Sequence, residues 1–306
     1  MELFQRKPVT NYKGRSALEF RKSLADAGIN IQPEVMTPAL PPNGIYVSPE
    51  TKNAFYEYSY GEVDGFKYEQ FVTSYYQDLA LTAECFAAVF AIELPQPTTP
   101  VYVESRTSFT FNSILGLQSV PVLKGIRGVR MDGDFSDFFT VYGRDEHALD
   151  AFITIVPNLM IDMLTSGSRY DVEFADRYVY FYRVYGAVRS GTRGGGDDSV
   201  SIGFSSNDYL EMRNFGIKYG TKFIRAARPA SSDTTADMRP LWQLVNDSQA
   251  ANNGRQFVWL IGILFYMLLF AILPYVMIPL SVVWFGVRYI QWAVRKRRLI
   301  SRWSGR

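Results

Sequence analysis

A run of thirty-two consecutive residues, 256–287, contains no charged side chain. A helix that crosses the hydrocarbon core of a bilayer needs about 20 apolar residues, so this run is longer than one upright span requires. Pro274 and Pro279 lie near its middle, and tryptophan and tyrosine residues lie toward its ends or beyond, where amphipathic rings favour the membrane interface. The run therefore predicts a membrane segment, and its length argues against a core helix of a soluble protein.

Two arrangements of this membrane segment fit the sequence. In a hairpin, short helices over 256–272 and 275–292 turn at the prolines, and both ends of the segment stay on one side. In a single kinked span, the two ends lie on opposite sides. Basic segments stay in the cytoplasm, and residues 1–15 contain no apolar stretch that could direct export of the upstream residues. We expect the hairpin, with the soluble domain and the tail in the cytoplasm and the chain integral to the cell membrane. The single span is the alternative.

The charge of the chain is divided between an acidic body and a basic tail. Seven Lys and Arg residues and no acid follow Val287, which leaves 25 basic residues against 30 acidic ones in 1–287. The tail predicts contact with anionic lipids, and a pure topology signal is the alternative. The acidic body argues against a nucleic-acid partner. The candidate membrane-surface residues are Arg288, Arg295, Lys296, Arg297, Arg298 and Arg302.

The body mixes helical and strand-like patterns and predicts an α+β fold, with an antiparallel sheet and packed helices. The expected division has five parts. They are an N-terminal helix and proline-rich connector (1–53), an α+β cytoplasmic domain (54–228), a linker (229–255), the membrane hairpin (256–292) and the basic tail (293–306).

Turn signals predict the first strands of the α+β domain. The aromatic-rich stretch that begins at residue 54 predicts a β-hairpin, with a turn at Asp64 and Gly65. The apolar run 79–94 predicts a buried strand pair that ends at Pro95 and Pro97.

Helical spacing and further strand patterns follow. Apolar residues three and four apart predict a helix over 145–164, with a kink or break at Pro157. Two strands, 170–174 and 178–184, are expected to be joined by a turn, and a helix is expected over 207–227.

Few side chains are available for catalysis. Cys85 is the only cysteine and His147 the only histidine, so a disulfide within the chain and a Cys-rich metal site are excluded. No G-x-S-x-G motif supports a serine nucleophile. The acidic stretch RMDGDFSDFF lacks the later ligands of a calcium loop, so we expect neither a metal nor a cofactor. The remaining candidate catalytic residues are Asp132, Asp134, Asp145 and His147.

The segment 129–182 resembles the core of a family of uncharacterised bacterial membrane-associated proteins, known as a domain of unknown function. The resemblance rests on the spacing of Phe135 and Phe139, on Val141-Tyr142, and on Pro157 within a Met- and Leu-rich helix before a β-hairpin. It extends over roughly 55–228 and implies a membrane-tethered α+β domain without an assigned activity. In that family the membrane helices precede the domain, whereas here the uncharged run follows it.

These observations favour a non-enzymatic interaction or scaffold protein at the cytoplasmic face of a membrane, with the bilayer and an unidentified protein as partners. A membrane-bound enzyme that uses the acidic residues is one alternative. A transport accessory subunit is another, although the uncharged run offers no charged lining for an ion pathway.

Overall fold

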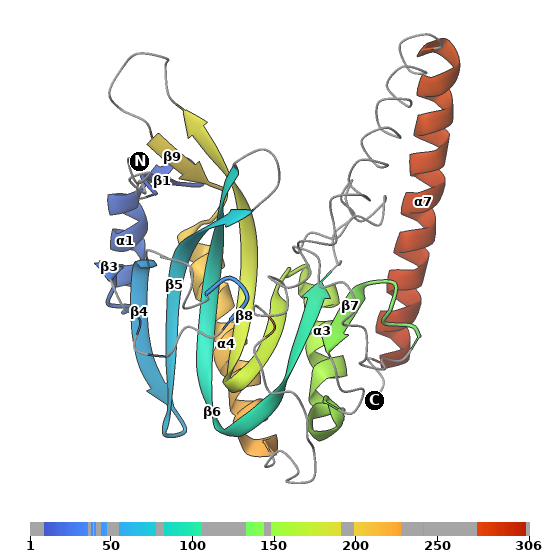
Figure 1. The fold of residues 1–306 in the computed structure, drawn as a ribbon. Helices are drawn as coiled ribbons and strands as arrows, with labels where there is room; N and C mark the ends of the chain where they lie inside the picture. The colour runs from blue at the N-terminus through green and yellow to red at the C-terminus, as the bar shows by residue number, and fades with distance from the viewer. Residues whose placement is uncertain are drawn as a thin grey trace.

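The computed structural model describes residues 9–35, 38, 40, 44–47, 55–77, 83–105, 133–143, 148–190, 199–227, 241 and 274–303. Figure 1 shows a curled sheet with helices packed on one face and a long C-terminal helix that rises beside it. The strands are β1 (Asn11–Tyr12), β2 (Arg15–Ser16), β3 (Gln32–Val35), β4 (Phe55–Val63), β5 (Phe66–Gln77), β6 (Ala83–Ser105), β7 (Phe139–Gly143), β8 (Asp171–Ser190) and β9 (Ser199–Ile202). The helices are α1 (Ala17–Asp26), the 3₁₀ turn η1 (Asp150–Phe152), α3 (Ile155–Ser166), α4 (Ser206–Ala226) and α7 (Pro274–Trp303).

The sheet confirms the predicted α+β class with mainly antiparallel pairing. Its strand order is β2-β1-β9-β8-β6-β5-β4-β3, and β7 pairs with the second half of β6. The β4–β5 hairpin turns at Asp64 and Gly65, which both have positive φ angles, as the sequence predicted. The pair β1–β9 is the parallel exception.

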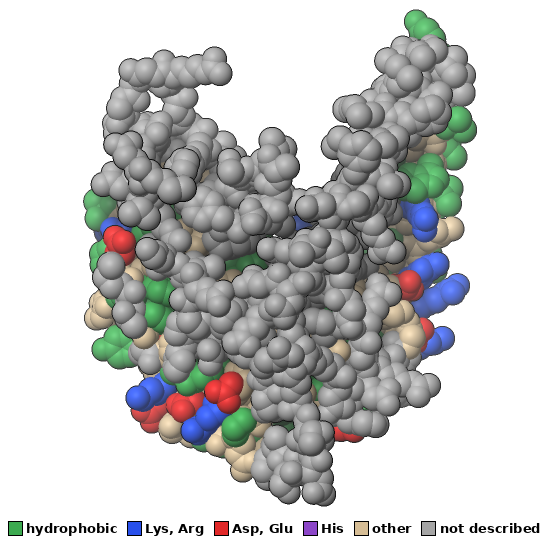
Figure 2. Space-filling model, viewed as in Figure 1, with side chains coloured by type: hydrophobic (Ala, Val, Ile, Leu, Met, Phe, Trp, Pro, Cys, Tyr) green, Lys and Arg blue, Asp and Glu red, His purple; other side chains and the backbone are tan. Residues whose placement is uncertain are grey.

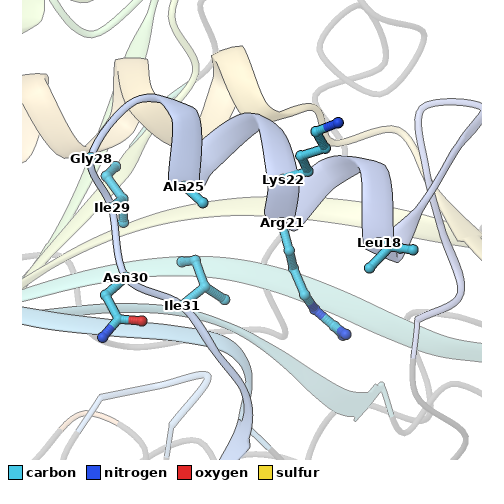
Figure 3. Close-up of a pocket in the computed structure, with 8 residues that line it drawn as sticks. All are labelled: Leu18, Arg21, Lys22, Ala25, Gly28, Ile29, Asn30 and Ile31. Carbon is cyan, nitrogen blue, oxygen red and sulfur yellow. The ribbon is translucent and has the colours of Figure 1, made fainter.

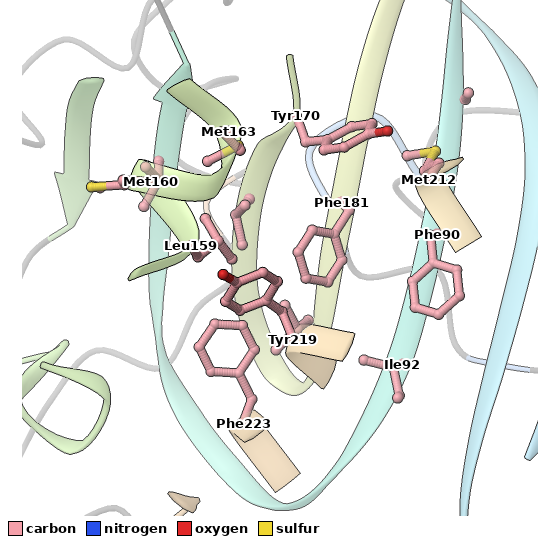
Figure 4. Close-up of a cluster of buried hydrophobic side chains, with 14 of the residues drawn as sticks. Phe90, Ile92, Leu159, Met160, Met163, Tyr170, Phe181, Met212, Tyr219 and Phe223 are labelled. Atoms are coloured by element: carbon pink, nitrogen blue, oxygen red, sulfur yellow. The ribbon is translucent and has the colours of Figure 1, made fainter. Parts of the chain in front are cut away.

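Both faces of the central strands are buried. One face packs against α1, α3 and α4 and forms the larger core, which includes Phe90, Phe181 and Phe223 (Figure 4). The other face carries a second core that includes Phe71 and Tyr180. Strands buried on both faces carry large aromatic residues at successive positions, which explains the continuous apolar and aromatic runs in the sequence.

Strand β6 corrects the prediction that Pro95 and Pro97 end a strand pair. A single strand of 23 residues runs through both prolines. Proline lacks the N–H that a sheet ladder needs, and both prolines lie between Glu93 and Thr98, where the pairing with β8 shifts register. The shift also exchanges the two faces, because Phe90 and Val101 point into the same core although one is even-numbered and the other odd-numbered.

Strand β8 corrects the predicted turn between 170–174 and 178–184. The strand is continuous, and Asp176 takes a left-handed φ of +54° opposite Thr98 of β6. The irregularity again exchanges the faces, so that Phe174 and Phe181 both reach the helical core. Ala175 and Asp176 therefore mark a bulge.

Helix α1 is held on the sheet by an ion pair whose carboxylate is buried. Ser16 and Glu19 form a capping box at its start, and Gly28 follows its end. Arg21 binds both carboxylate oxygens of Glu57 at 2.7 Å, and the Tyr12 hydroxyl donates to the same carboxylate at 3.2 Å. Burial raises the pKa of Glu57, and the Arg21 cation opposes that rise.

Helix α4 begins one residue before its predicted start, whereas α3 begins later than predicted, because residues 148–154 form turns and η1 instead of helix. α3 begins at Ile155, two residues before Pro157, because proline is tolerated in the first turn of a helix. The predicted start at 145 lies outside the described residues. α4 has a capping box formed by Ser205 and Asp208, so the cap is Ser205.

Helix α7 is a continuous helix of 30 residues. It begins at Pro274 and contains Pro279. The predicted helix end at 292 is wrong, because residues 288–303 contain neither glycine nor proline and the helix continues to Trp303. The first helix of the predicted hairpin, 256–272, lies outside the described residues. Within the described part of the chain, no helix is both long and apolar enough to cross a membrane.

Helix α4 lies close to β6 because two of its residues lack side chains. A Cβ atom on Gly216 would lie 2.6 Å from Cε1 and 2.7 Å from Cγ of Phe90, and one on Gly220 would lie 2.7 Å from Cδ1 of Ile92. Such distances require the ring or the helix to move.

We expect Gly216→Ala to lower the free energy of unfolding by about 1–2 kcal/mol, because the clash with Phe90 outweighs the gain in helix propensity. Gly286→Ala in α7 is the matched control, since no atom lies within 4 Å of its added Cβ. The measurement is urea unfolding of the detergent-solubilised chain. Equal stability of the two variants would contradict the close packing of α4 on β6.

Candidate functional site

The C-terminal part of α7 packs against the α+β domain. Leu299 is 2% exposed, the ring of Trp303 lies 5.1 Å from that of Phe135, and the ring of Trp292 lies 6.3 Å from that of Phe138. Figure 1 shows this end of α7 beside α3 and β7. We call the contact of residues 292–303 with the turn 133–138 and α3 the tail junction.

Two ion pairs flank the apolar contacts of the tail junction. Arg295 donates to Asp137 at 2.8 Å, and Arg302 pairs with Asp134. The four side chains are 39–64% exposed. Exposed ion pairs contribute only about 0–1 kcal/mol each, so the buried Leu299 and the aromatic rings supply most of the stabilisation, and the ion pairs fix the register.

The local sequence explains the tail junction. Trp292, Lys296, Leu299 and Trp303 recur at spacings of three and four and form one stripe of α7. The aromatic residues Phe135 and Phe138 of the turn supply the opposite surface. The charge pattern predicted only a cationic tail, whereas the spacing of Trp292, Leu299 and Trp303 was a further signal for packing.

Asp134 is the one candidate catalytic residue within the described part of the chain. It forms the ion pair with Arg302 on the surface of the tail junction. Asp132, Asp145 and His147 lie outside the described residues. The geometry of Asp134 is that of a structural contact, and no second candidate from the sequence is placed beside it.

The candidate membrane-surface residues differ in their surroundings. Arg295 and Arg302 belong to the tail junction. Arg288 lies over the ring of Trp284 at 5.5 Å, and Lys296 lies over the ring of Trp292 at 5.2 Å. Arg297 and Arg298 are also exposed.

The sheet face opposite the helices carries four carboxyl groups, each of which accepts a hydrogen bond from a tyrosine hydroxyl. This tyrosine–carboxyl face was not predicted from the sequence. The only available signal was the alternation of acidic and aromatic residues in 171–182. The pairs are Tyr58–Glu69 (2.9 Å), Tyr102–Asp171 (2.7 Å), Tyr142–Glu104 (3.0 Å) and Tyr182–Glu173 (2.7 Å).

Two of these carboxyl groups have pKa values that burial raises toward neutral. Burial raises the pKa of Glu173 to about 7, although its Oε2 accepts hydrogen bonds from Tyr182 and from the backbone N–H of Ile45. The Oε1 atom of Glu173 is buried and has no hydrogen-bond partner among the described residues. Burial likewise raises the pKa of Asp171 to about 7, against the effect of hydrogen bonds from Ser105 and Tyr102.

The tyrosine–carboxyl face anchors the segment around residues 40–47. Glu173 accepts from the backbone of Ile45, Glu69 accepts from the backbone of Leu40 at 3.3 Å, and Tyr46 packs on Tyr182. Glu69, Glu104 and Glu173 are at most 2% exposed. Perturbed pKa values also occur in structural networks, and the enclosure of these groups fits that role better than contact with a substrate.

A shallow groove lies along α1 (Figure 3). Its apolar lining includes Leu18, Ala25 and Ile31. Figure 3 shows Arg21 pointing toward the strands, where Glu57 neutralises it, and Lys22 pointing away. Arg21 is therefore already paired and is not available to a ligand in the groove.

Within the described residues, no group of three or more His, Cys, Asp or Glu side chains could hold a metal ion. The expectation that no metal or cofactor is bound stays a prediction.

Comparisons with known proteins do not assign a family. No family model matches the chain, and no curated protein matches it. A solved structure, that of the mycobacterial trehalose monomycolate transport factor A, aligns with 70% of this chain and 97% of its own length, at 13% identity and a TM-score of 0.38. A likeness at that level carries no argument about function.

We expect Leu299→Ala to lower the free energy of opening of the tail junction by about 2–3 kcal/mol, because it removes a buried side chain. The double variant Asp134→Asn, Asp137→Asn should cost less than about 1 kcal/mol, because it removes only exposed ion pairs. Hydrogen exchange of residues 292–303 measures both effects, with α4 as an internal reference. A double variant that frees the helix as much as Leu299→Ala would show that charge holds the junction.

The raised pKa of Glu173 predicts a stability that falls as pH rises. The folded state keeps a proton that the unfolded state releases near pH 4.5, so this contribution is fully present below that pH and is lost as pH rises through about 7. The free energy of unfolding of the unsubstituted chain should fall between pH 5 and pH 8 by about 1–3 kcal/mol more than that of Glu173→Gln, which has no proton to release. Urea unfolding at both pH values tests this, and parallel pH profiles for the two proteins would contradict it.

Proposed function

We propose that the chain is a non-enzymatic interaction or scaffold protein, whose α+β domain is held at the cytoplasmic face of the cell membrane by residues 256–292. The observation that carries this proposal is the division of α7 into a packed half and an uncovered apolar half. Residues 292–303 contact the domain, whereas the preceding residues expose large apolar side chains. These include Tyr275, Ile278, Leu280, Val282, Val283, Val287 and Ile290, which are 48–93% exposed.

The uncovered half of α7 has the character of a membrane-inserted surface. Figure 2 shows hydrophobic side chains along its upper part and basic side chains along its lower part. Fully burying one Val, Leu or Ile side chain gains about 1.5–3 kcal/mol, so several adjacent ones in water represent a large unfavourable exposure. Contiguous exposed apolar surface of this kind marks contact with a membrane or a partner.

The length of the uncovered half supports an anchor made from more than this helix. Residues 274–287 contain no charge and reach about 21 Å at 1.5 Å per residue. The hydrocarbon core of a bilayer is about 30 Å thick. The uncharged residues 256–273 precede α7 and would supply the other helix of the hairpin.

The tail junction favours the hairpin over the single kinked span. In a single span, the domain before residue 256 and the tail after residue 287 would lie on opposite sides of the membrane. Leu299 and Trp303 instead contact the domain directly, and such contact requires the domain and the tail to share one side. An even number of crossings meets this requirement, and the basic character of the tail favours the cytoplasmic side.

The interaction role follows from the domain itself. The proposed kinship with uncharacterised membrane-associated proteins over 55–228 agrees with a tethered domain but adds no activity. Asp134 is committed to Arg302, and the carboxyl groups opposite the helices hold the 40–47 segment in place. These arrangements favour a binding module over an enzyme that uses acidic residues. The partner on the domain side is an unidentified protein.

Retention in washed membranes tests the anchor. We expect the full chain to stay with membranes after an alkaline carbonate wash and to enter solution only with detergent. Val283→Asp should lower the retained fraction, because a charge at the centre of a membrane helix costs about 2.5–3.5 kcal/mol. Ile153→Asp is the matched control, since Ile153 is 66% and Val283 63% exposed. Recovery of the unsubstituted chain as a monodisperse species in the aqueous fraction would refute the proposal.

A further inference from the structure

The arginines of α7 fall into two groups. Arg295 and Arg302 are engaged with Asp137 and Asp134 in the tail junction. Within the described residues, Arg288, Arg297 and Arg298 are exposed and make no ion pair with an acid. The sequence alone shows one uniform basic tail, whereas the fold separates a junction pair from a free set.

We propose that the free set, Arg288, Arg297 and Arg298, binds the anionic headgroups of the lipid leaflet next to the domain, while Arg295 and Arg302 make no headgroup contact. This inference rests on the proposed membrane anchor. It assigns the lipid selectivity of the anchor to particular residues.

The position of the free set along α7 suits this role. Arg288 directly follows the uncharged run, so its guanidinium lies at the edge of the hydrocarbon core once 274–287 are inserted. Arg297 lies about 14 Å further along the helix. Anionic lipids attract cations over about a Debye length of 8–10 Å, and the arginine side chain or a tilt of the helix shortens the gap.

Other groups around α7 add positive charge on the same side. Arg169, which follows α3, lies close enough to Lys296 for its charge to contribute to a lowered pKa of that lysine, although burial is the larger cause. Two like charges brought together in this way favour a nearby anion. Tyr289 and Trp292 stack with their rings 6.2 Å apart, and such amphipathic rings are preferred at the headgroup level.

The identity of the occupant follows from the combination of features. An acidic protein surface would satisfy the free arginines but would leave the neighbouring apolar side chains of 275–290 exposed. A lipid leaflet with anionic headgroups covers both, with acyl chains against the apolar half and phosphates against the arginines.

A vesicle competition tests the assignment. The detergent-solubilised full chain is diluted into a mixture of two separately labelled vesicle populations, one of phosphatidylcholine and one of phosphatidylcholine with phosphatidylglycerol. The ratio of chain recovered in each population is measured after flotation. The unsubstituted chain is expected to prefer the anionic vesicles, and added salt is expected to reduce that preference.

Two variants with equal charge change separate the groups. Arg297→Gln, Arg298→Gln should lower the preference for anionic vesicles by about ten-fold. Arg295→Gln, Arg302→Gln changes the net charge equally but should lower it by at most about three-fold, because in the proposed arrangement those guanidinium groups contact Asp137 and Asp134 and not the headgroups. Positions 297 and 298 lie between 295 and 302, so depth along the helix cannot explain a difference.

Each outcome has a defined meaning. Equal recovery of the unsubstituted chain in both vesicle populations would overturn the headgroup assignment while leaving the anchor in place. Equal losses for the two double variants would also overturn it, because the effect would then be one of net charge alone. Recovery in neither population would contradict the membrane anchor itself, and therefore the proposed function.

Discussion

The contact between the end of α7 and the turn 133–138 constrains the rest of the molecule. Leu299 is buried there, and Trp303 meets Phe135 edge to face. This apolar contact joins the last described residues of the chain to the middle of the α+β domain. The uncharged run 256–287 is consequently held between two attachments to the same body. Any membrane that receives this run must leave both attachments on one side, which is why a packing contact carries information about topology.

The sheet carries aromatic residues on both faces because each face is buried in a core, and its two longest strands change face midway. In β6 the change occurs between Glu93 and Val101, and in β8 it occurs at Asp176. These irregularities lie opposite one another and curl the sheet around the helical core. One face then receives α3 and α4, and the other buries the tyrosine–carboxyl pairs. Burial of carboxyl groups disfavours their charged forms, which lowers the free energy of unfolding at neutral pH. The same carboxyl groups accept hydrogen bonds from the backbone of Leu40 and Ile45 and hold these residues on the sheet.

The sequence predicted the elements that depend on local signals. The α+β class, the β4–β5 hairpin and the extent of α4 follow from turn residues and helical spacing. Prolines 95 and 97 were misinterpreted as a strand end, because a proline can lie in a strand wherever the ladder is interrupted, and that interruption is a tertiary property. The same holds for Asp176, whose polar neighbourhood is typical of a turn but here marks a bulge.

The candidate site could be predicted only in part. The sequence indicated Asp134 as a chemical group and Arg302 as a membrane contact, and the fold brings the two together as an ion pair. Nothing local to residues 134 or 302 predicts that pairing, because it depends on where α7 lies against α3. The carboxyl groups of Glu173 and Asp171 escaped notice for a similar reason, since their burial depends on coverage by distant segments.

Side-specific labelling tests the central claim most directly. Single cysteines are placed at the exposed positions Asn30 in the domain and Ser301 in the tail, each in a Cys85→Ser background. They are treated with a membrane-impermeant maleimide in sealed vesicles of both orientations. A tail that packs against the domain predicts labelling of both positions from the same side. Labelling from opposite sides would show that the tail junction does not form in the membrane-bound chain, and it would favour the single kinked span.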